Sequence, residues 1–238
     1  MAIEENSLIL IPARYASTRF PGKPLVDIAG KPMVQHVYEK AAAVAAHVYV
    51  ATDDERIYDA VLAFGGRAVM TSDAHRSGTD RCYEAYTKVK EMLQCNFDVV
   101  VNVQGDEPFI IPEQIESLIT CFEDPAVQIA TLAKPFEKND EIFDPNKVKV
   151  VFSTNHTALY FSRNPIPYCR ARSVIRIRRK FAFLFWCSDS ICVFCPPVRL
   201  FLYFVTRAPT RGFYAFGVQR PYWDAEKPTR GRVSADGL

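Results

Sequence analysis

The sequence predicts an α/β protein with a doubly wound, mostly parallel sheet, and three observations support this fold class. Short apolar runs with the length and composition of buried parallel strands recur at residues 8–11, 48–51 and 99–103. The segments between them are amphipathic with helical spacing. Strands that alternate with helices in this way are typical of a parallel sheet with right-handed crossovers. At 238 residues the chain fits one large α/β domain, or a domain with a small appendage.

The composition indicates a soluble globular protein, with 49% hydrophobic residues and a net charge of +2. The first ten residues contain no basic segment followed by a long apolar one, so we expect no secretory signal. Seven cysteines at irregular spacing then predict reduced thiols in a cytoplasmic protein.

Charge divides the chain into two parts near residue 170. Residues 1–170 carry a net charge of −6, whereas residues 171–238 carry +8 and are rich in Arg and aromatic side chains. We therefore interpret residues 1–170 as the functional domain and residues 171–238 as an atypical tail.

The first strand is expected at residues 8–11, and Pro12 is expected to end its pairing because proline has no backbone N–H. A loop of small residues and cations follows: Ala13, Ala16, Ser17 and Gly22, with Arg14, Arg19 and Lys23. Small side chains let a phosphate chain approach backbone N–H groups, and Arg and Lys bind phosphate oxygens. The loop is a candidate triphosphate site at the carboxyl end of the first strand. The alternative is a surface loop whose cations are simply solvated.

Further along the chain, turn residues and apolar spacing predict four helices and two short strands. The helices are expected at residues 33–46, from the 52–55 segment to about 64, from the 77–79 segment to about 93, and at 112–122; the strands are expected at 68–70 and 129–133.

Residues 75–81 precede the third of these helices and allow two interpretations. Ser77 or Thr79 can cap the helix, with Asp80 in its first turn. Alternatively, the exposed N–H groups and Arg81 bind a base or a ribose. Both interpretations can hold together, and His75 taken alone is typical of a solvated loop.

Residues 104–108, Gln-Gly-Asp-Glu-Pro, follow the apolar run at 99–103. A carboxylate directly after a central strand lies in the crevice where open α/β sheets bind ligands. Mg²⁺ takes one or two carboxylates together with phosphate oxygens, so Asp106 is a candidate magnesium ligand. The alternative is a simple turn.

Four segments, IPARYASTRFPGKPL at 11–25, Ser77-Gly-Thr-Asp-Arg81, QGDEP at 104–108 and ALYFSR at 158–163, together resemble the sugar-activating nucleotidyltransferases. The resemblance is to the members that activate 3-deoxy-manno-octulosonate (Kdo) with CTP, and it covers about residues 8–170. It implies a Rossmann-like nucleotidyltransferase fold, transfer of CMP to Kdo with release of pyrophosphate for lipopolysaccharide biosynthesis, Mg²⁺ as cofactor and a homodimer. An enzyme for another acidic sugar, of the sialic-acid type, is the alternative.

The resemblance also implies roles for individual residues. The catalytic residues would be Arg14, Lys23 and Asp106, with Asp106 as the metal ligand. The CTP-binding residues would be Ala13, Arg14, Ser17, Lys23, Ser77, Gly78, Thr79 and Arg81. The sugar-binding residues would be Gln104 and Arg163; an Arg fork suits the sugar carboxylate, although Arg163 could equally point to solvent.

The tail departs from the resembled family, whose late segments, including one that supplies a second metal-binding Asp, are not present in place. Asp224 is a poor match for that Asp. The tail has no pattern of a nucleic-acid-binding module, no apolar stretch long enough for a membrane span and no paired Cys motif. We therefore expect neither a nucleic-acid nor a membrane partner, and interpret the tail as the product of a shifted reading frame. A catalytically dead or unstable nucleotide-binding product is then a further alternative.

Overall fold

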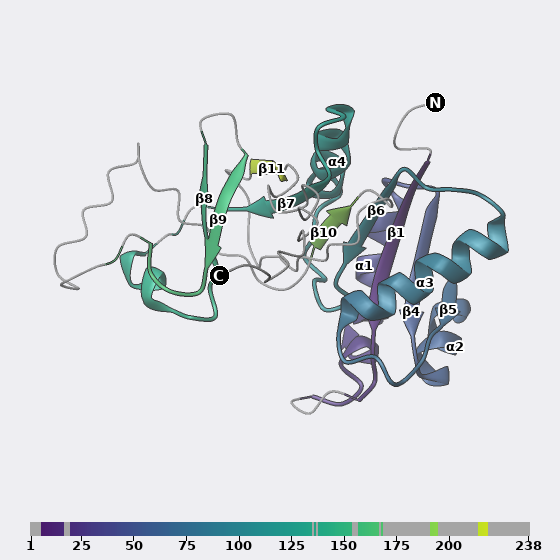
Figure 1. Cartoon of the computed structure of the whole chain (residues 1–238). Helices are drawn as coiled ribbons and strands as arrows, with labels where there is room; N and C mark the ends of the chain where they lie inside the picture. The colour runs from purple at the N-terminus through teal and green to yellow at the C-terminus, as the bar shows by residue number, and fades with distance from the viewer. Residues whose placement is uncertain are drawn as a thin grey trace, which may run out of the picture.

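The computed structural model describes residues 6–16, 20–134, 136, 138–153, 157–166, 168, 191–194 and 214–218. Its main feature is a seven-stranded sheet with the strand order β11-β7-β10-β6-β1-β4-β5 (Figure 1). β1 pairs in parallel with both β4 and β6, β5 pairs in parallel with β4, and β10 is antiparallel to β6 and to β7. The predicted mostly parallel sheet is therefore confirmed.

These strands and helices have the following bounds: β1 Ser7–Ala13, α1 Met33–Ala42, β4 His47–Thr52, α2 Glu55–Ala63, β5 Ala68–Met70, α3 Gly78–Leu93, β6 Val99–Val103, α4 Pro112–Thr120, β7 Ile129–Ala133, β8 Lys149–Phe152, β9 Ala158–Ser162, β10 Ile191–Phe194 and β11 Tyr214–Val218. The short strands β2 Asp27–Ile28 and β3 Lys31–Pro32 form a separate hairpin, and short 3₁₀ segments lie at Lys23–Leu25, Cys121–Glu123 and Asn139–Phe143. Among the described residues, no helix is both long and apolar enough to cross a membrane.

Helices cover both faces of the sheet, which is the predicted double winding. Ile9 and Ile11 of β1 pack in one hydrophobic cluster with residues of α1, α2 and α4. Leu8 and Leu10 pack in a second cluster with residues of α3. Because successive residues of a strand point to opposite faces, β1 is buried on both sides and reads as a continuous apolar run.

The expectation that Pro12 ends the first strand is wrong. Pro12 and Ala13 continue the pairing with β4, opposite Ala51 and Thr52. The pairing of β1 with β6 stops at Leu10, opposite Asn102. Beyond Leu10 the strand pairs on one side only, so a residue without an N–H is tolerated there.

The predicted helices are present, with small differences at their ends. α1 stops at Ala42, four residues earlier than expected. α2 is capped by Asp54 and α3 by Ser77, each through a side-chain oxygen that accepts a backbone N–H. Ser77 is one of the two caps that the sequence predicted for α3, and Asp54 lies within the 52–55 segment where α2 was expected to begin.

The last described parts of the chain extend the sheet and add a hairpin. β8 and β9 form an antiparallel pair, and Val150 of β8 packs in a cluster with Ala133 at the end of β7. β10 and β11 come from the predicted tail, yet both pair inside the main sheet. The division of the chain after residue 170 remains a prediction.

Candidate functional site

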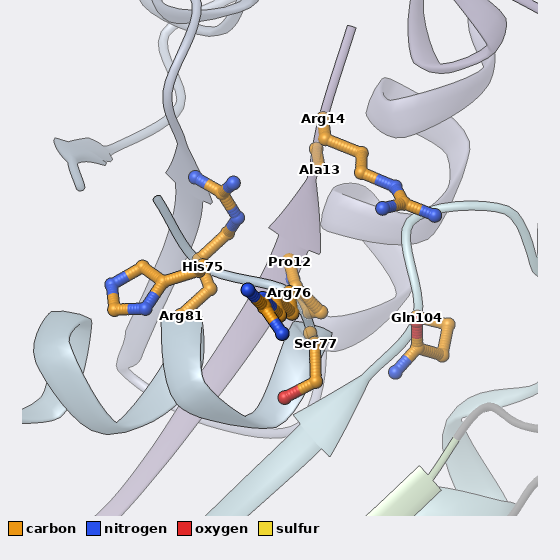
Figure 2. Close-up of a pocket in the computed structure, with 9 residues that line it drawn as sticks. Pro12, Ala13, Arg14, His75, Arg76, Ser77, Arg81 and Gln104 are labelled. Carbon is orange, nitrogen blue, oxygen red and sulfur yellow. The ribbon is translucent and has the colours of Figure 1, made fainter. Parts of the chain in front are cut away.

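A pocket of about 130 Å³ lies at the carboxyl ends of β1 and β6. The chain places β4 and β5 on one side of β1 and β6 on its other side, so the pocket lies at the topological switch point of the sheet. Open α/β sheets bind ligands at this kind of position. Three segments line the pocket: the end of β1 with the residue after it, the connection into α3 with the first turn of that helix, and the residue after β6 (Figure 2). The lining residues are Pro12, Ala13, Arg14, His75, Arg76, Ser77, Gly78, Arg81 and Gln104.

The charge of this lining has one sign. Of the nine described residues that form it, three are arginines and none is an aspartate or a glutamate. Arg14 and Arg76 are exposed, whereas Arg81 is only 3% exposed. Arg presents a planar fork of donors that matches phosphate and carboxylate oxygens, so the pocket suits an anion.

The pocket gathers six of the predicted site residues from three separate motifs: Ala13, Arg14, Ser77, Gly78, Arg81 and Gln104. Their individual roles toward a nucleotide or sugar remain predictions. The sequence did not single out Pro12 or Arg76 as lining residues, and it took His75 for a solvated loop residue. Their places directly beside the predicted motifs were the available signal.

We call the described residues 14–16 and 20–23 the β1 loop. Ser17 lies outside the described residues. The two described ends of the loop meet, because the backbone N–H of Gly22 donates to the backbone oxygen of Tyr15 at 2.9 Å. Gly22 has φ +69°, a left-handed conformation that favours glycine. The turn brings Lys23 back toward the carboxyl end of β6.

Lys23 and Asp106 form an ion pair at 2.5 Å between Nζ and Oδ2. Neither residue lines the pocket, and both side chains are more than a third exposed. The pair places the predicted catalytic lysine and the predicted metal ligand next to each other, although they are far apart in the sequence.

The fit of Mg²⁺ to these residues rests on one carboxylate. Within the described part of the chain, no group of three or more His, Cys, Asp or Glu residues could hold a metal ion. Mg²⁺ can be bound by a single carboxylate if substrate phosphates and water supply the other oxygens. Asp106 fits that arrangement, but it does not make a metal site without a phosphate ligand.

The amino end of α3 forms one side of the pocket. Ser77 Oγ accepts the backbone N–H of Asp80 at 3.1 Å and donates to the Asp80 carboxylate at 2.5 Å. Gly78 follows at the first position of the helix and lines the pocket, whereas Thr79 is buried in the first turn and does not. The predicted cap is therefore confirmed for Ser77, and the segment lines the pocket, while its binding of a base or a ribose remains a prediction.

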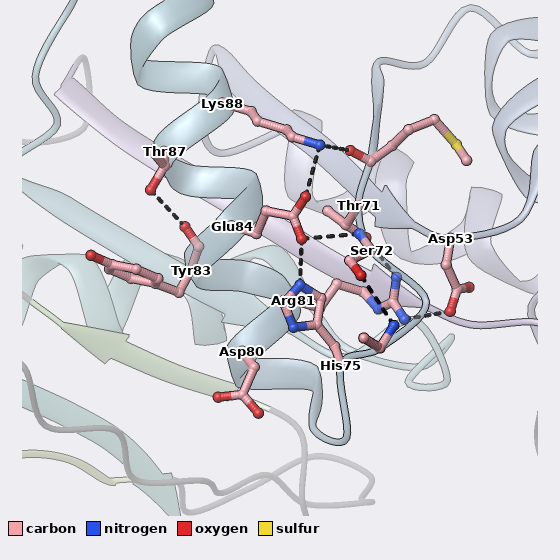
Figure 3. Close-up of polar contacts among 12 residues, drawn as sticks. Asp53, Thr71, Ser72, His75, Asp80, Arg81, Tyr83, Glu84, Thr87 and Lys88 are labelled. Atoms are coloured by element: carbon pink, nitrogen blue, oxygen red, sulfur yellow. Dashed lines mark hydrogen bonds and ion pairs between the residues drawn. The ribbon is translucent and has the colours of Figure 1, made fainter.

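Arg81 is fixed by two partners from other elements (Figure 3). Its NH1 donates to Thr71 Oγ1 at 2.6 Å, and its NH2 donates to Asp53 Oδ2 at 2.5 Å. A buried Arg needs hydrogen-bond partners, so these two contacts fix the orientation of the Arg81 guanidinium at the pocket. The sequence did not identify Asp53 as a site residue; its place directly after β4 was the available signal.

His75 is held by Glu84 of α3, and Glu84 also accepts the Ser72 backbone N–H at 2.9 Å and pairs with Lys88 at 2.7 Å (Figure 3). Burial alone would raise the pKa of Glu84, but the hydrogen bonds from Lys88, Ser72 and His75 lower it to about 2. Glu84 therefore stays ionised and orients a residue of the pocket lining.

Gly105 lets β1 and β6 approach each other at the base of the site. A Cβ at this position would lie only 3.1 Å from the backbone oxygen of Pro12. Gln104 precedes it, and its Nε2 donates to Asn102 Oδ1 at 3.3 Å. A side chain at 105 would separate the two strand ends that carry the site.

Arg163 does not lie at the pocket. It follows β9, is exposed, and donates from NH1 to the backbone oxygen of Pro145 at 3.0 Å. The fully buried Lys149 donates to the backbone oxygen of Arg163 at 2.9 Å, and burial lowers the pKa of Lys149. The described contacts of Arg163 are thus with the β8–β9 hairpin and the residues before it, and its sugar-binding role remains a prediction.

Comparison with known proteins bears on this geometry. Residues 8–185 match the family model described as cytidylyltransferase, and this range includes every residue of the pocket.

Two curated relatives are 3-deoxy-manno-octulosonate cytidylyltransferases. The one from Parabacteroides distasonis is 61% identical over 167 residues, which cover 68% of this chain and 65% of the relative. The one from Escherichia coli is 53% identical over 168 residues, which cover 69% of this chain and 65% of the relative. The chain thus matches slightly less than two thirds of the length of these relatives.

A solved structure of CMP:2-keto-3-deoxy-manno-octonic acid synthetase complexed with CTP superposes with a TM-score of 0.68. It is 44% identical in sequence, and the alignment covers 81% of this chain and 75% of that one.

Proposed function

The chain belongs to the cytidylyltransferase family, and from that premise we propose that it transfers CMP from CTP to Kdo and releases pyrophosphate. The observation that supports this most directly is the pocket at the carboxyl ends of β1 and β6, whose described lining residues include three arginines and no carboxylate. The similarity to 3-deoxy-manno-octulosonate cytidylyltransferases supports Kdo as the sugar. The similarity to a synthetase solved in complex with CTP supports CTP as the nucleotide.

In the proposed reaction a hydroxyl oxygen of the sugar bonds to the α-phosphorus of CTP, and the hydroxyl proton passes to solvent. The bond between that phosphorus and the bridging oxygen breaks, and the electron pair leaves with pyrophosphate. Arg14 and Lys23, at the two ends of the β1 loop, would offset the charge that gathers on the leaving group. The protein would act by positioning and charge stabilisation, and no protein nucleophile is needed.

We include Mg²⁺ in the proposal as the cofactor, with Asp106 as the residue that would hold it. When bound with the triphosphate, the ion would supply positive charge to the phosphate oxygens. In the proposal, Lys23 then exchanges Asp106 for a phosphate oxygen, for which its exposed side chain is accessible.

The proposal also places the protein in the cytoplasm, in lipopolysaccharide biosynthesis, as a homodimer. In the described part of the chain, Cys82, Cys95 and Cys121 are free thiols. Leu159 and Tyr160 of β9 are more than half exposed, so a second copy could bury them.

Pyrophosphate release in the presence of CTP, Mg²⁺ and Kdo tests the proposed function. We expect release with Kdo and CTP, less with UTP, and less when a sialic acid replaces Kdo. Faster release with the sialic acid would assign the other acidic sugar as acceptor. Binding of CTP without any release would contradict the transfer reaction and leave a nucleotide-binding protein.

A further inference from the structure

The side chain of Tyr15 lies at the point where the β1 loop closes on itself. Its backbone oxygen accepts the N–H of Gly22, and a Cβ at Gly22 would lie only 3.0 Å from the Tyr15 ring. The ring is half-buried and packs against the main hydrophobic cluster. Tyr15 thus links the two described ends of the β1 loop.

Arg56 of α2 stacks on this ring from a different element. The central guanidinium carbon of Arg56 lies 3.3 Å from the centroid of the Tyr15 ring. A cation over the face of an aromatic ring is attracted by the negative charge of that face. The contact joins the first turn of α2 to the β1 loop.

Asp54 fixes the plane of the Arg56 guanidinium. Arg56 Nε donates to Asp54 Oδ1 at 2.9 Å and NH2 donates to Oδ2 at 2.7 Å, so both carboxylate oxygens are engaged. Asp54 also caps α2, because its Oδ1 accepts the backbone N–H of Arg56. Two parallel bonds to a capped helix end leave Arg56 little freedom to rotate away from Tyr15.

We infer that Arg56 is a positioning residue, which acts through Tyr15 to hold the β1 loop so that Arg14 and Lys23 face the triphosphate. The inference rests on the proposed function. Arg56 does not line the pocket, and its side chain is 59% exposed, so it contributes little to the core. Its stack on Tyr15 therefore serves the geometry of the β1 loop more than the stability of the fold.

The chain offers a matched control in Arg67, which lies over the ring of Tyr49. Its guanidinium carbon is 5.7 Å from that ring centroid, and its NH1 donates to the backbone oxygen of Ala46. Arg67 lies outside the pocket lining. Arg67→Ala removes an arginine over a tyrosine without touching the β1 loop.

Hydrogen exchange of the Gly22 amide tests the contact without any ligand. Arg56→Ala should raise the exchange rate about two- to fivefold, the effect of losing an exposed cation–π contact. Arg67→Ala should leave the rate unchanged. An unchanged Gly22 rate in Arg56→Ala, with the variant folded as judged by circular dichroism, would overturn the inference.

Calorimetric titration with CTP and with CMP tests the positioning role. Arg56→Ala should weaken CTP binding about two- to fivefold and leave CMP binding unchanged, because CMP lacks the outer phosphates. Tyr15→Phe keeps the ring and should bind CTP as the unaltered chain does. Tyr15→Leu should match Arg56→Ala, and the double variant should be no weaker than either. Equal weakening for CTP and CMP would indicate a general loss of structure and overturn the inference.

The two experiments separate this inference from the proposed function. If the unaltered chain binds no CTP, the proposed function fails, and the Gly22 exchange rates alone decide whether Arg56 holds the β1 loop.

Discussion

Two exposed ion pairs of this protein are similar in geometry but lie at different places in the fold. Lys23–Asp106 and Lys31–Glu39 are both exposed pairs, at 2.5 and 2.8 Å. Exposed pairs contribute about 0–1 kcal/mol to folding, so neither should matter much for stability. Only Lys23–Asp106 joins the loops that follow β1 and β6, at the candidate site.

Lys23→Ala should lower turnover strongly and change stability little. Removing one preorganised charge from a developing anion costs about 2.7–4 kcal/mol of transition-state stabilisation, a fall in rate of about 10²–10³. The measurement is pyrophosphate release together with urea unfolding. Lys31→Ala, which breaks the comparable pair outside the pocket, should leave both values nearly unchanged. Normal turnover of Lys23→Ala would show that Lys23 is only a solvated loop residue.

Residue types and their order predicted six of the nine described residues that line the pocket, but not the partners of their side chains. Arg81 was a candidate from its motif, whereas its contacts with Asp53 and Thr71 depend on how β4, β5 and α3 meet. Arg163 was also a candidate from its motif, yet in the structure its guanidinium donates a hydrogen bond to the backbone oxygen of Pro145, away from the pocket. Such partners depend on packing, which local sequence patterns do not contain.

The connection between β5 and α3 is held by one carboxylate that reaches back from the helix. Glu84 accepts the Ser72 N–H, pairs with Lys88 and bonds to His75, so three groups favour its ionised form. Its pKa of about 2 lies below the ordinary value of 4.5. The ionised carboxylate therefore stabilises the folded state.

Stability should depend on pH through this residue. A lowered pKa in the folded state means that the contribution of Glu84 is complete above about pH 4.5 and is lost as the pH falls toward 2. The contribution is at most about 3 kcal/mol. Urea unfolding of the unaltered chain and of Glu84→Gln between pH 7 and pH 2.5 should show their difference shrinking at low pH. Glu91→Gln, at an exposed position on the same helix, is the control variant.

Most elements could be predicted because their periodicity is strong, and the errors arose where pairing depends on neighbours. β6 was evident from an apolar run of five residues. Pro12 was misjudged because its tolerance depends on β6 having already stopped pairing at Leu10. Strand lengths in this sheet are set by where adjacent strands end, and a single strand does not reveal that.

At the scale of the whole molecule, β10 joins two parts of the sheet: β7 and β11 on one side, and β6, β1, β4 and β5 on the other. Val193 pairs with Val101 of β6 on one side and with Ala130 of β7 on the other. Among the described strands, β7 therefore joins the remaining parallel strands by way of a strand from the predicted tail.

Val193→Pro should lower the free energy of unfolding by at least about 1–3 kcal/mol, the cost of one unsatisfied buried backbone group. Proline removes the N–H that a central strand needs for its pairing. Urea unfolding should also show a less steep transition, because the halves of the sheet would separate. Val193→Thr keeps the N–H and is the control. Equal stability of both variants would mean that β10 does not join β6 to β7 in solution.

The position of β10 in the chain also has a consequence for synthesis on the ribosome. β6 and β7 are made long before Ile191, the first residue of β10, emerges. Until then, the edge of β6 that faces away from β1 has no partner strand, and such an edge can pair with other chains. The nascent protein would be most prone to aggregation in this interval, so slow translation between residues 134 and 190 should lower its soluble yield more than slow translation before residue 98.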